Sequence, residues 1–156
     1  PGLVLDLSHK PDAEPVTVAD LEAALTKENL SINPGAIVLI RTGRDRFMGQ
    51  RDFPQRGPGV SRAATEWLIA QGVKIMGIAM GLDAPLKSQI AKIKQGADPE
   101  LFWEAHRVGT RQEYCHIEQL ANLGELPPSG FKLAVFPLKI MGASGAPARV
   151  VAIFEE

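Results

Sequence analysis

The chain has 156 residues, of which 45% are hydrophobic and 22% are charged, and its formal net charge is −1. This composition fits one globular domain and excludes a strongly basic protein, so we expect no binding to nucleic acid or to a membrane surface. The single cysteine excludes an internal disulfide, which fits a reducing, cytoplasmic setting.

The first third of the chain predicts strands separated by a helix. Residues 2–7 are apolar enough for a strand, and Thr17 begins a capping-box-like start to a helix that ends near Lys27. Residues 36–40 are apolar and β-branched, which is typical of a central buried strand. The polar stretch 41–58 that follows is long for a compact domain, and loops of this length are often functional.

The middle of the chain continues the same alternation. Ser61 is suited to cap a helix over residues 62–70, and residues 73–80 form a second buried apolar run. Residues 81–85 follow the end of that strand. In open α/β sheets, ligands bind near such strand ends.

The remaining segments complete a mixed pattern. We expect helices over 86–94 and 99–107, a short strand over 115–120, and a closing strand pair over 131–140 and 148–154. The alternation predicts an α/β fold and one domain over residues 1–156. Because the chain starts with Pro1 and enters a strand at once, we expect that a preceding segment is missing.

One stretch, residues 105–120, gathers the groups that can bind a metal or move a proton. It holds two of the three histidines, the only cysteine, the only tyrosine and two glutamates. By residue type alone, a histidine on a helix and a glutamate on a strand are more often plain surface residues.

Two neighbours on the predicted strand 115–120 have competing interpretations. His116 stands two residues before Glu118, so their side chains share one face, and His116 could orient a ligand or carry a proton. A partly buried histidine without such a role explains it equally well. Cys115 could be a nucleophile, but a buried structural cysteine is the better interpretation.

Candidate substrate contacts lie at the strand ends and near His106. Arg41 and Arg44 could hold a carboxylate, or could simply face solvent. Asp83 could position a polar group or cap the helix 86–94. Trp103 could line a pocket for an aromatic substrate, although core packing is the safer interpretation.

Several stretches occur in an order and spacing that cover nearly the whole chain: 38–45, 58–61, 77–85, 105–106, 116–123, 126–128, 130–131, 136–140 and 148–153. Together they resemble the cyclase-like metal-dependent hydrolases, the family that contains bacterial kynurenine formamidase and isatin hydrolase. The resemblance implies a swivelling β/β/α fold. It also implies hydrolysis of non-peptide C–N bonds in a small-molecule amide, as in the arylformamidase step of tryptophan catabolism.

The resemblance also implies a zinc or manganese site. Family members bind the metal through a His-x-Gly-Thr-His-x-Asp motif together with one later histidine and one later glutamate, and His106 and Glu118 match these last two positions. The motif itself is absent from this sequence. Residues 106–113 resemble it, but their spacing is off by one, so they do not count as the motif. We therefore expect the motif upstream of Pro1, and a homodimer or larger homo-oligomer. The alternative is a catalytically inactive binding or scaffold domain.

Overall fold

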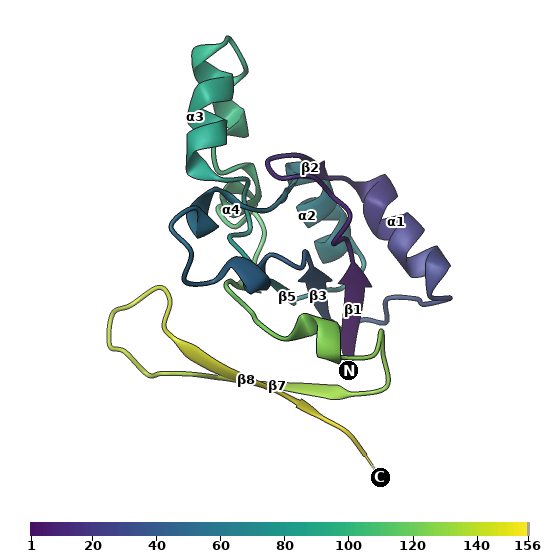
Figure 1. Ribbon diagram of the computed structural model, residues 1–156. Helices are drawn as coiled ribbons and strands as arrows, with labels where there is room; N and C mark the ends of the chain where they lie inside the picture. The colour runs from purple at the N-terminus through teal and green to yellow at the C-terminus, as the bar shows by residue number, and fades with distance from the viewer. Residues whose placement is uncertain (156) are drawn as a thin grey trace.

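The computed structural model describes residues 1–155, and its centre is a four-stranded parallel sheet in the order β1-β3-β5-β6 (Figure 1). The strands are β1 (Gly2–Asp6), β3 (Ile37–Arg41), β5 (Ile75–Ile78) and β6 (Cys115–Ile117). Each of the four lies within a predicted strand or one residue beyond it. The α/β class is therefore confirmed, and the parallel pairing explains why β1, β3 and β5 are apolar on both faces.

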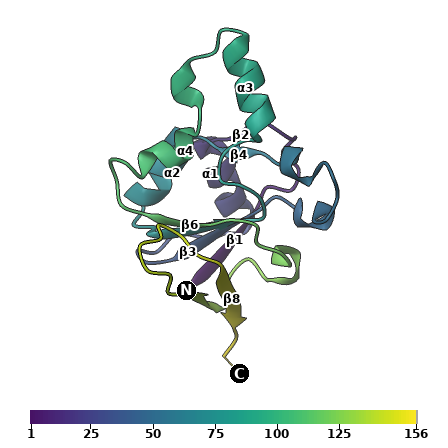
Figure 2. The same ribbon diagram turned by 90° about the vertical axis from the view of Figure 1, so that its left-hand side faces the viewer.

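Helices cover one face of the sheet and a hairpin covers part of the other (Figures 1 and 2). The helical layer contains α1 (Val18–Lys27), α2 (Arg62–Ala70) and α4 (Glu104–Val108). Below the sheet lies the antiparallel pair β7 (Lys132–Pro137) and β8 (Ala148–Ile153). The core is divided accordingly: Leu5 and Ile40 pack toward the helices, while Val4 and Leu39 pack toward the hairpin.

Local signals explain the helix boundaries. Thr17 and Asp20 form the expected reciprocal capping box, and the Ser61 side chain accepts a hydrogen bond from the backbone N–H of Ala64. The short pair β2 (Pro15–Val16) and β4 (Gly59–Val60) leads into α2. At Gly59, a Cβ atom would lie 2.0 Å from the backbone nitrogen of Ala84, so only glycine permits this approach.

The prediction of one continuous helix over residues 99–107 is wrong, because the helix is interrupted. A 3-10 turn, η3 (Pro99–Leu101), is separated from α4 by Trp103, whose φ of 52° is left-handed. Helix α3 (Leu86–Lys94) precedes this break and projects from the body (Figures 1 and 2). The strand predicted over 115–120 is also shorter than expected, since Gln119 has a φ of 57°.

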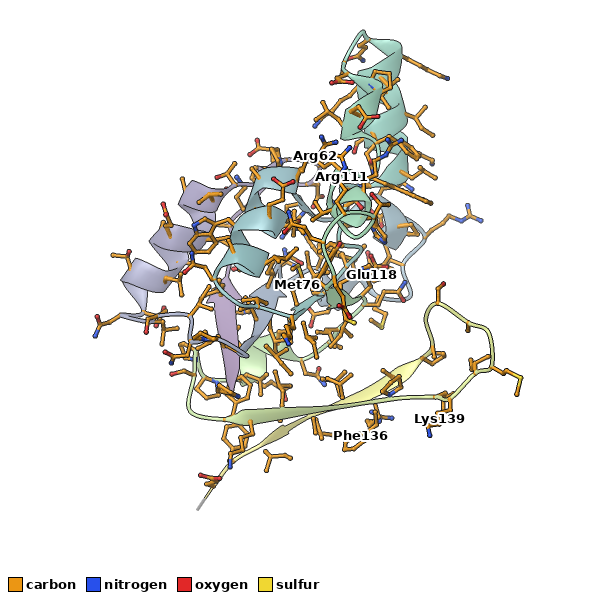
Figure 3. The ribbon with its side chains drawn as sticks, turned by 180° about the vertical axis from the view of Figure 1, so that it is seen from behind. Arg62, Met76, Arg111, Glu118, Phe136 and Lys139 are labelled. Atoms are coloured by element: carbon orange, nitrogen blue, oxygen red, sulfur yellow. The ribbon has the colours of Figure 1, made fainter. Side chains whose placement is uncertain are left out.

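The connections and the hairpin complete the chain. Three further 3-10 turns are η1 (Asp45–Phe47), η2 (Phe53–Gln55) and η4 (Leu123–Glu125). Phe136 and Lys139 stand on the hairpin, apart from the body that carries Met76 and Glu118 (Figure 3). Within residues 1–155, the helices are all too short or too polar to cross a bilayer.

Candidate metal centre

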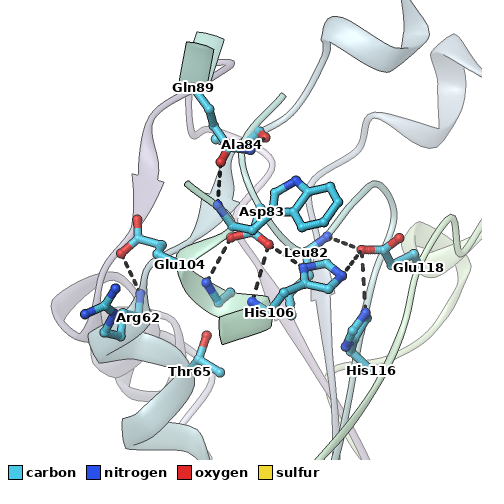
Figure 4. A network of polar contacts seen from close by, with 12 residues as sticks. Arg62, Thr65, Leu82, Asp83, Ala84, Gln89, Glu104, His106, His116 and Glu118 are labelled. Atoms are coloured by element: carbon cyan, nitrogen blue, oxygen red, sulfur yellow. Dashed lines mark hydrogen bonds and ion pairs between the residues drawn. The ribbon is translucent and has the colours of Figure 1, made fainter. Parts of the chain in front are cut away.

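Three side chains from α4, β6 and the residue just after β6 converge on one point (Figure 4). The Nε2 atoms of His106 and His116 lie 3.8 and 3.7 Å from Oε1 of Glu118. The two imidazole rings meet edge to face, with their centroids 4.4 Å apart. One ligand atom from each residue lies within 4.8 Å of the other two, so a single cation could contact all three.

Asp83 holds His106 in place. It follows β5, and its carboxylate, only 6% exposed, accepts hydrogen bonds from the backbone N–H groups of Ala105 (2.9 Å) and His106 (3.4 Å). The same carboxylate contacts Nδ1 of the His106 ring. When Nδ1 carries the proton, Nε2 is left with a free lone pair that faces Glu118.

This role corrects one prediction from the sequence. Asp83 does not cap the helix at residues 86–94, because α3 is preceded by Pro85 and has no side-chain cap. Asp83 instead satisfies the first backbone N–H groups of α4, whose own N-cap residue, Trp103, supplies no side-chain bond. The start of α4 is also joined to α2, since Glu104 accepts a hydrogen bond from the backbone N–H of Arg62.

Glu118 is anchored to the same loop. Its Oε1 accepts a hydrogen bond of 2.8 Å from the backbone N–H of Leu82, which is fully buried. Leu82 and Asp83 both follow β5, so the end of one central strand fixes both a carboxylate and an imidazole. The tendency of ligands to bind near the ends of parallel strands pointed to this loop, but it did not predict that Asp83 contacts His106.

The two histidines have opposite protonation preferences. The hydrogen bond that the His106 ring donates to Asp83 raises the pKa of His106, against the opposing effect of burial, and the charges of Asp83 and Glu118 add to the rise. Burial lowers the pKa of His116, and the neighbouring His106 lowers it further. His116 is therefore a neutral imidazole at pH 7, the form that can bind a metal or accept a proton.

An open cavity of about 310 Å³ gives access to this cluster, and it is lined by His106, Glu118 and Trp103 among others. Trp103 is 50% exposed, so the prediction that it packs in the core is wrong. Phe53 and Arg56 also line this cavity and come from the long loop over residues 41–58. Sequence reasoning marked that loop as functional but did not single out these two residues.

A second open cavity, of about 730 Å³, is lined by His116 and Glu118 among others. Cys115 lines it and is exposed, so the prediction of a buried structural cysteine is wrong. The reason is topological: β6 is the outermost strand of the sheet formed by residues 1–155, and one edge of it has no neighbouring strand there.

The predicted arginine contacts lie elsewhere. Arg41 pairs with Asp6 at 2.8 Å and is not among the residues that line either cavity. Arg44 is 8% exposed, and its guanidinium donates to Asp12 and to three backbone carbonyls. Arg44 therefore stabilises the loop through these hydrogen bonds. The two predictions for Arg44, that it faces solvent or that it holds a carboxylate ligand, are both wrong.

Fold and cluster together define an α/β protein with a candidate divalent-metal centre at the end of a parallel strand. The chain belongs to the family described as "Putative cyclase", whose model matches residues 1–84. This match includes Asp83 and ends before His106. The family resemblance inferred from the ordered sequence stretches is thus confirmed.

Relatives with known structures extend the likeness to the whole chain. An isatin hydrolase of Roseibium aggregatum is 30% identical over 165 residues, which cover 98% of this chain and 59% of that protein. The structure of isatin hydrolase A from Ralstonia solanacearum matches with a TM-score of 0.81 at 30% identity, over 99% of this chain and 60% of that one. Isatin hydrolase A from Labrenzia aggregata, bound to benzyl benzoate, matches with a TM-score of 0.80 at 28% identity, over 100% and 61%. The chain spans about 60% of the length of each relative.

Proposed function

We propose that this chain contributes part of the active site of a metal-dependent hydrolase that cleaves amide-type C–N bonds. His106 and Glu118 are the metal ligands that it supplies. The observation that carries the proposal is the convergence of an imidazole and a carboxylate from separate elements, each fixed by the loop that follows β5.

The donor set fits a divalent metal. Imidazole nitrogen and carboxylate oxygen are the ligands that zinc and manganese take in hydrolytic sites. A metal-binding histidine commonly donates its other ring N–H to a carboxylate, and Asp83 occupies that position beside Nδ1 of His106. A bound divalent ion supplies Lewis acidity, which polarises a carbonyl group and acidifies water.

His116 has a separate part in this proposal. Its Nε2 lies 3.7 Å from Glu118, and its lowered pKa keeps the ring neutral at pH 7. A neutral imidazole at this position accepts a proton from the attacking water and can return it to the leaving nitrogen. Burial of the His116 ring lowers its pKa and so favours the neutral form, which is the form that can accept a proton.

The names of the relatives support a substrate class. Isatin is a cyclic amide of an aryl amine, so we propose a cyclic aryl amide or an N-formyl-arylamine as substrate. Hydrolysis of an N-formyl-arylamine is the arylformamidase reaction of tryptophan breakdown. His106 and Glu118 alone are fewer ligands than a catalytic site takes. We propose that the others come from a segment outside the described residues, or from a second copy in a homo-oligomer.

The alternative is a binding or scaffold domain, and the absence of the His-x-Gly-Thr-His-x-Asp pattern from residues 1–156 favours it. The test uses the full-length gene product, its metal content and its hydrolysis of isatin and N-formylkynurenine. We expect bound metal and turnover, both lost in Glu118→Gln and both kept in His9→Gln, which changes an exposed histidine outside the cluster. A full-length protein without metal or turnover would refute the hydrolase proposal and favour the scaffold alternative.

A further inference from the structure

Trp103 adopts a backbone conformation that tryptophan rarely takes. Its φ of 52° and ψ of 43° are left-handed, where a Cβ atom crowds the following carbonyl oxygen. Such a conformation persists only when surrounding contacts hold it, and residues of this kind cluster at functional sites. Trp103 is also 50% exposed, so core burial is not what holds it.

The contact that holds Trp103 is a buried glutamine. Gln89 on α3 is 7% exposed, and its Oε1 accepts a hydrogen bond of 2.8 Å from the backbone N–H of Trp103. Its Nε2 donates to the backbone oxygen of Ala84, one residue after Asp83. One carboxamide thus joins α3 to two walls of the cavity that His106 and Glu118 line, and both ends of that carboxamide are used.

The consequence is a flat aromatic surface beside the metal centre. The indole of Trp103 stacks on Phe102, with centroids 5.3 Å apart and planes inclined by 22°. Its centroid lies 5.7 Å from the His106 ring, at an inclination of 33°. Gln89, Trp103, His106 and Glu118 all line the same 310 Å³ cavity, and half of the Trp103 surface is open to it or to solvent.

We propose that Trp103 selects aromatic amides by stacking on the substrate ring, and that Gln89 is the positioning residue that keeps the indole in place. This inference rests on the proposed function for the identity of the cavity as the active site. Aromatic rings gain from offset stacking in a way that an aliphatic amide of similar size does not. Trp103 therefore separates the two substrate classes, while His106 and Glu118 treat their carbonyl groups alike.

Fluorescence tests the proposal directly, because the chain has two tryptophans. In Trp67→Phe of the 156-residue chain, the only remaining indole is Trp103, and isatin should quench its emission in a saturable way. In the matched control, Trp103→Phe, the remaining Trp67 packs against the core and should show only linear quenching. The absence of saturable quenching of Trp103 would overturn the proposal.

Steady-state kinetics of the metal-loaded full-length protein, with KM as the measure of apparent binding, separates stacking from a merely structural role. Trp103→Gly should weaken isatin binding about tenfold and leave the binding of succinimide, a non-aromatic cyclic imide, unchanged. Relief of the left-handed backbone strain by glycine should offset part of the stability that is lost with the stacking on Phe102. Gln89→Leu should also weaken isatin binding selectively, and the double variant should be no weaker than Trp103→Gly alone.

The outcomes for the two proposals are distinct. An equal loss of isatin and succinimide binding, or unchanged isatin binding in Trp103→Gly, overturns the role of Trp103 even when metal and turnover are present. Saturable quenching of Trp103 by isatin, combined with a full-length protein that holds no metal and turns over no substrate, supports the aromatic surface and overturns the proposed hydrolase.

Discussion

Replacing Asp83 by asparagine removes one defined contact from the candidate site. Asparagine keeps an oxygen that can accept the hydrogen bond from the backbone N–H of Ala105, now 2.9 Å long. The lost contact is the one between the carboxylate and Nδ1 of His106. A hydrogen bond to a charged group contributes roughly 1.5–3 kcal/mol. Because the His106 side chain is 37% exposed, solvent screening reduces the expected loss to about 1 kcal/mol.

The loss should depend on pH with a definite sign. Asp83 raises the pKa of His106 above its ordinary value of 6.5, so the folded state binds the proton more tightly than the unfolded chain. This stabilisation is fully present below pH 6.5 and is lost as the pH rises through the folded-state pKa. His116, whose pKa is lowered, contributes with the opposite sign, but it remains in both proteins and largely cancels from their difference.

Urea unfolding of metal-free protein measures this difference. We expect Asp83→Asn to be about 1 kcal/mol less stable than the parent near pH 5.5, with a smaller deficit near pH 9. Asp98→Asn is the matched control, since Asp98 caps only the turn η3 and contacts no histidine. A deficit that is equal at both pH values, or no deficit at all, would refute the argument that Asp83 acts through the His106 ring.

Three further expectations concern the fold around the site. Gly59→Ala should lower the free energy of unfolding by about 2 kcal/mol, because its Cβ would meet the Ala84 backbone at 2.0 Å. Gly145→Ala is the control and should change little, because open space surrounds Gly145. Equal effects of the two substitutions in thermal unfolding would contradict this. Burial raises the pKa of Tyr114, the only tyrosine, to about 12, so tyrosinate absorbance should rise near that pH, and a midpoint near 10 would mean that the ring is solvated. Thr17→Ala should cost about 1 kcal/mol in chemical unfolding through loss of the capping box, and an unchanged midpoint would argue against that cap.

Local patterns predicted the regular elements well because their causes are local. The buried run at 73–80 contains the strand β5, and the run at 36–40 matches β3 to within one residue. Thr17 and Ser61 cap the helices expected at 18–27 and 62–70. The predicted helix at 86–94 has the same bounds as α3. Hydrophobic periodicity and caps act within a few residues, so a single sequence reveals them.

The errors near the site have tertiary causes. The helix expected over 99–107 breaks at Trp103 because Gln89, 14 residues earlier, holds that backbone, and nothing in the neighbouring sequence marks the break. Asp83 reaches His106 across 23 residues, so its role was not visible either. Cys115 was placed in the core by residue type, whereas its exposure follows from the position of β6 in the sheet. The pairing of His106 with Glu118 came from the family resemblance and not from spacing.

The most direct test measures divalent-metal binding by the full-length protein and its variants, with zinc and manganese titrated separately. We expect binding that Glu118→Gln weakens at least about tenfold, that His116→Gln weakens less, and that His9→Gln leaves unchanged. No detectable binding of either ion, or equal affinity in Glu118→Gln and the parent chain, would contradict the assignment of His106 and Glu118 as ligands of one cation.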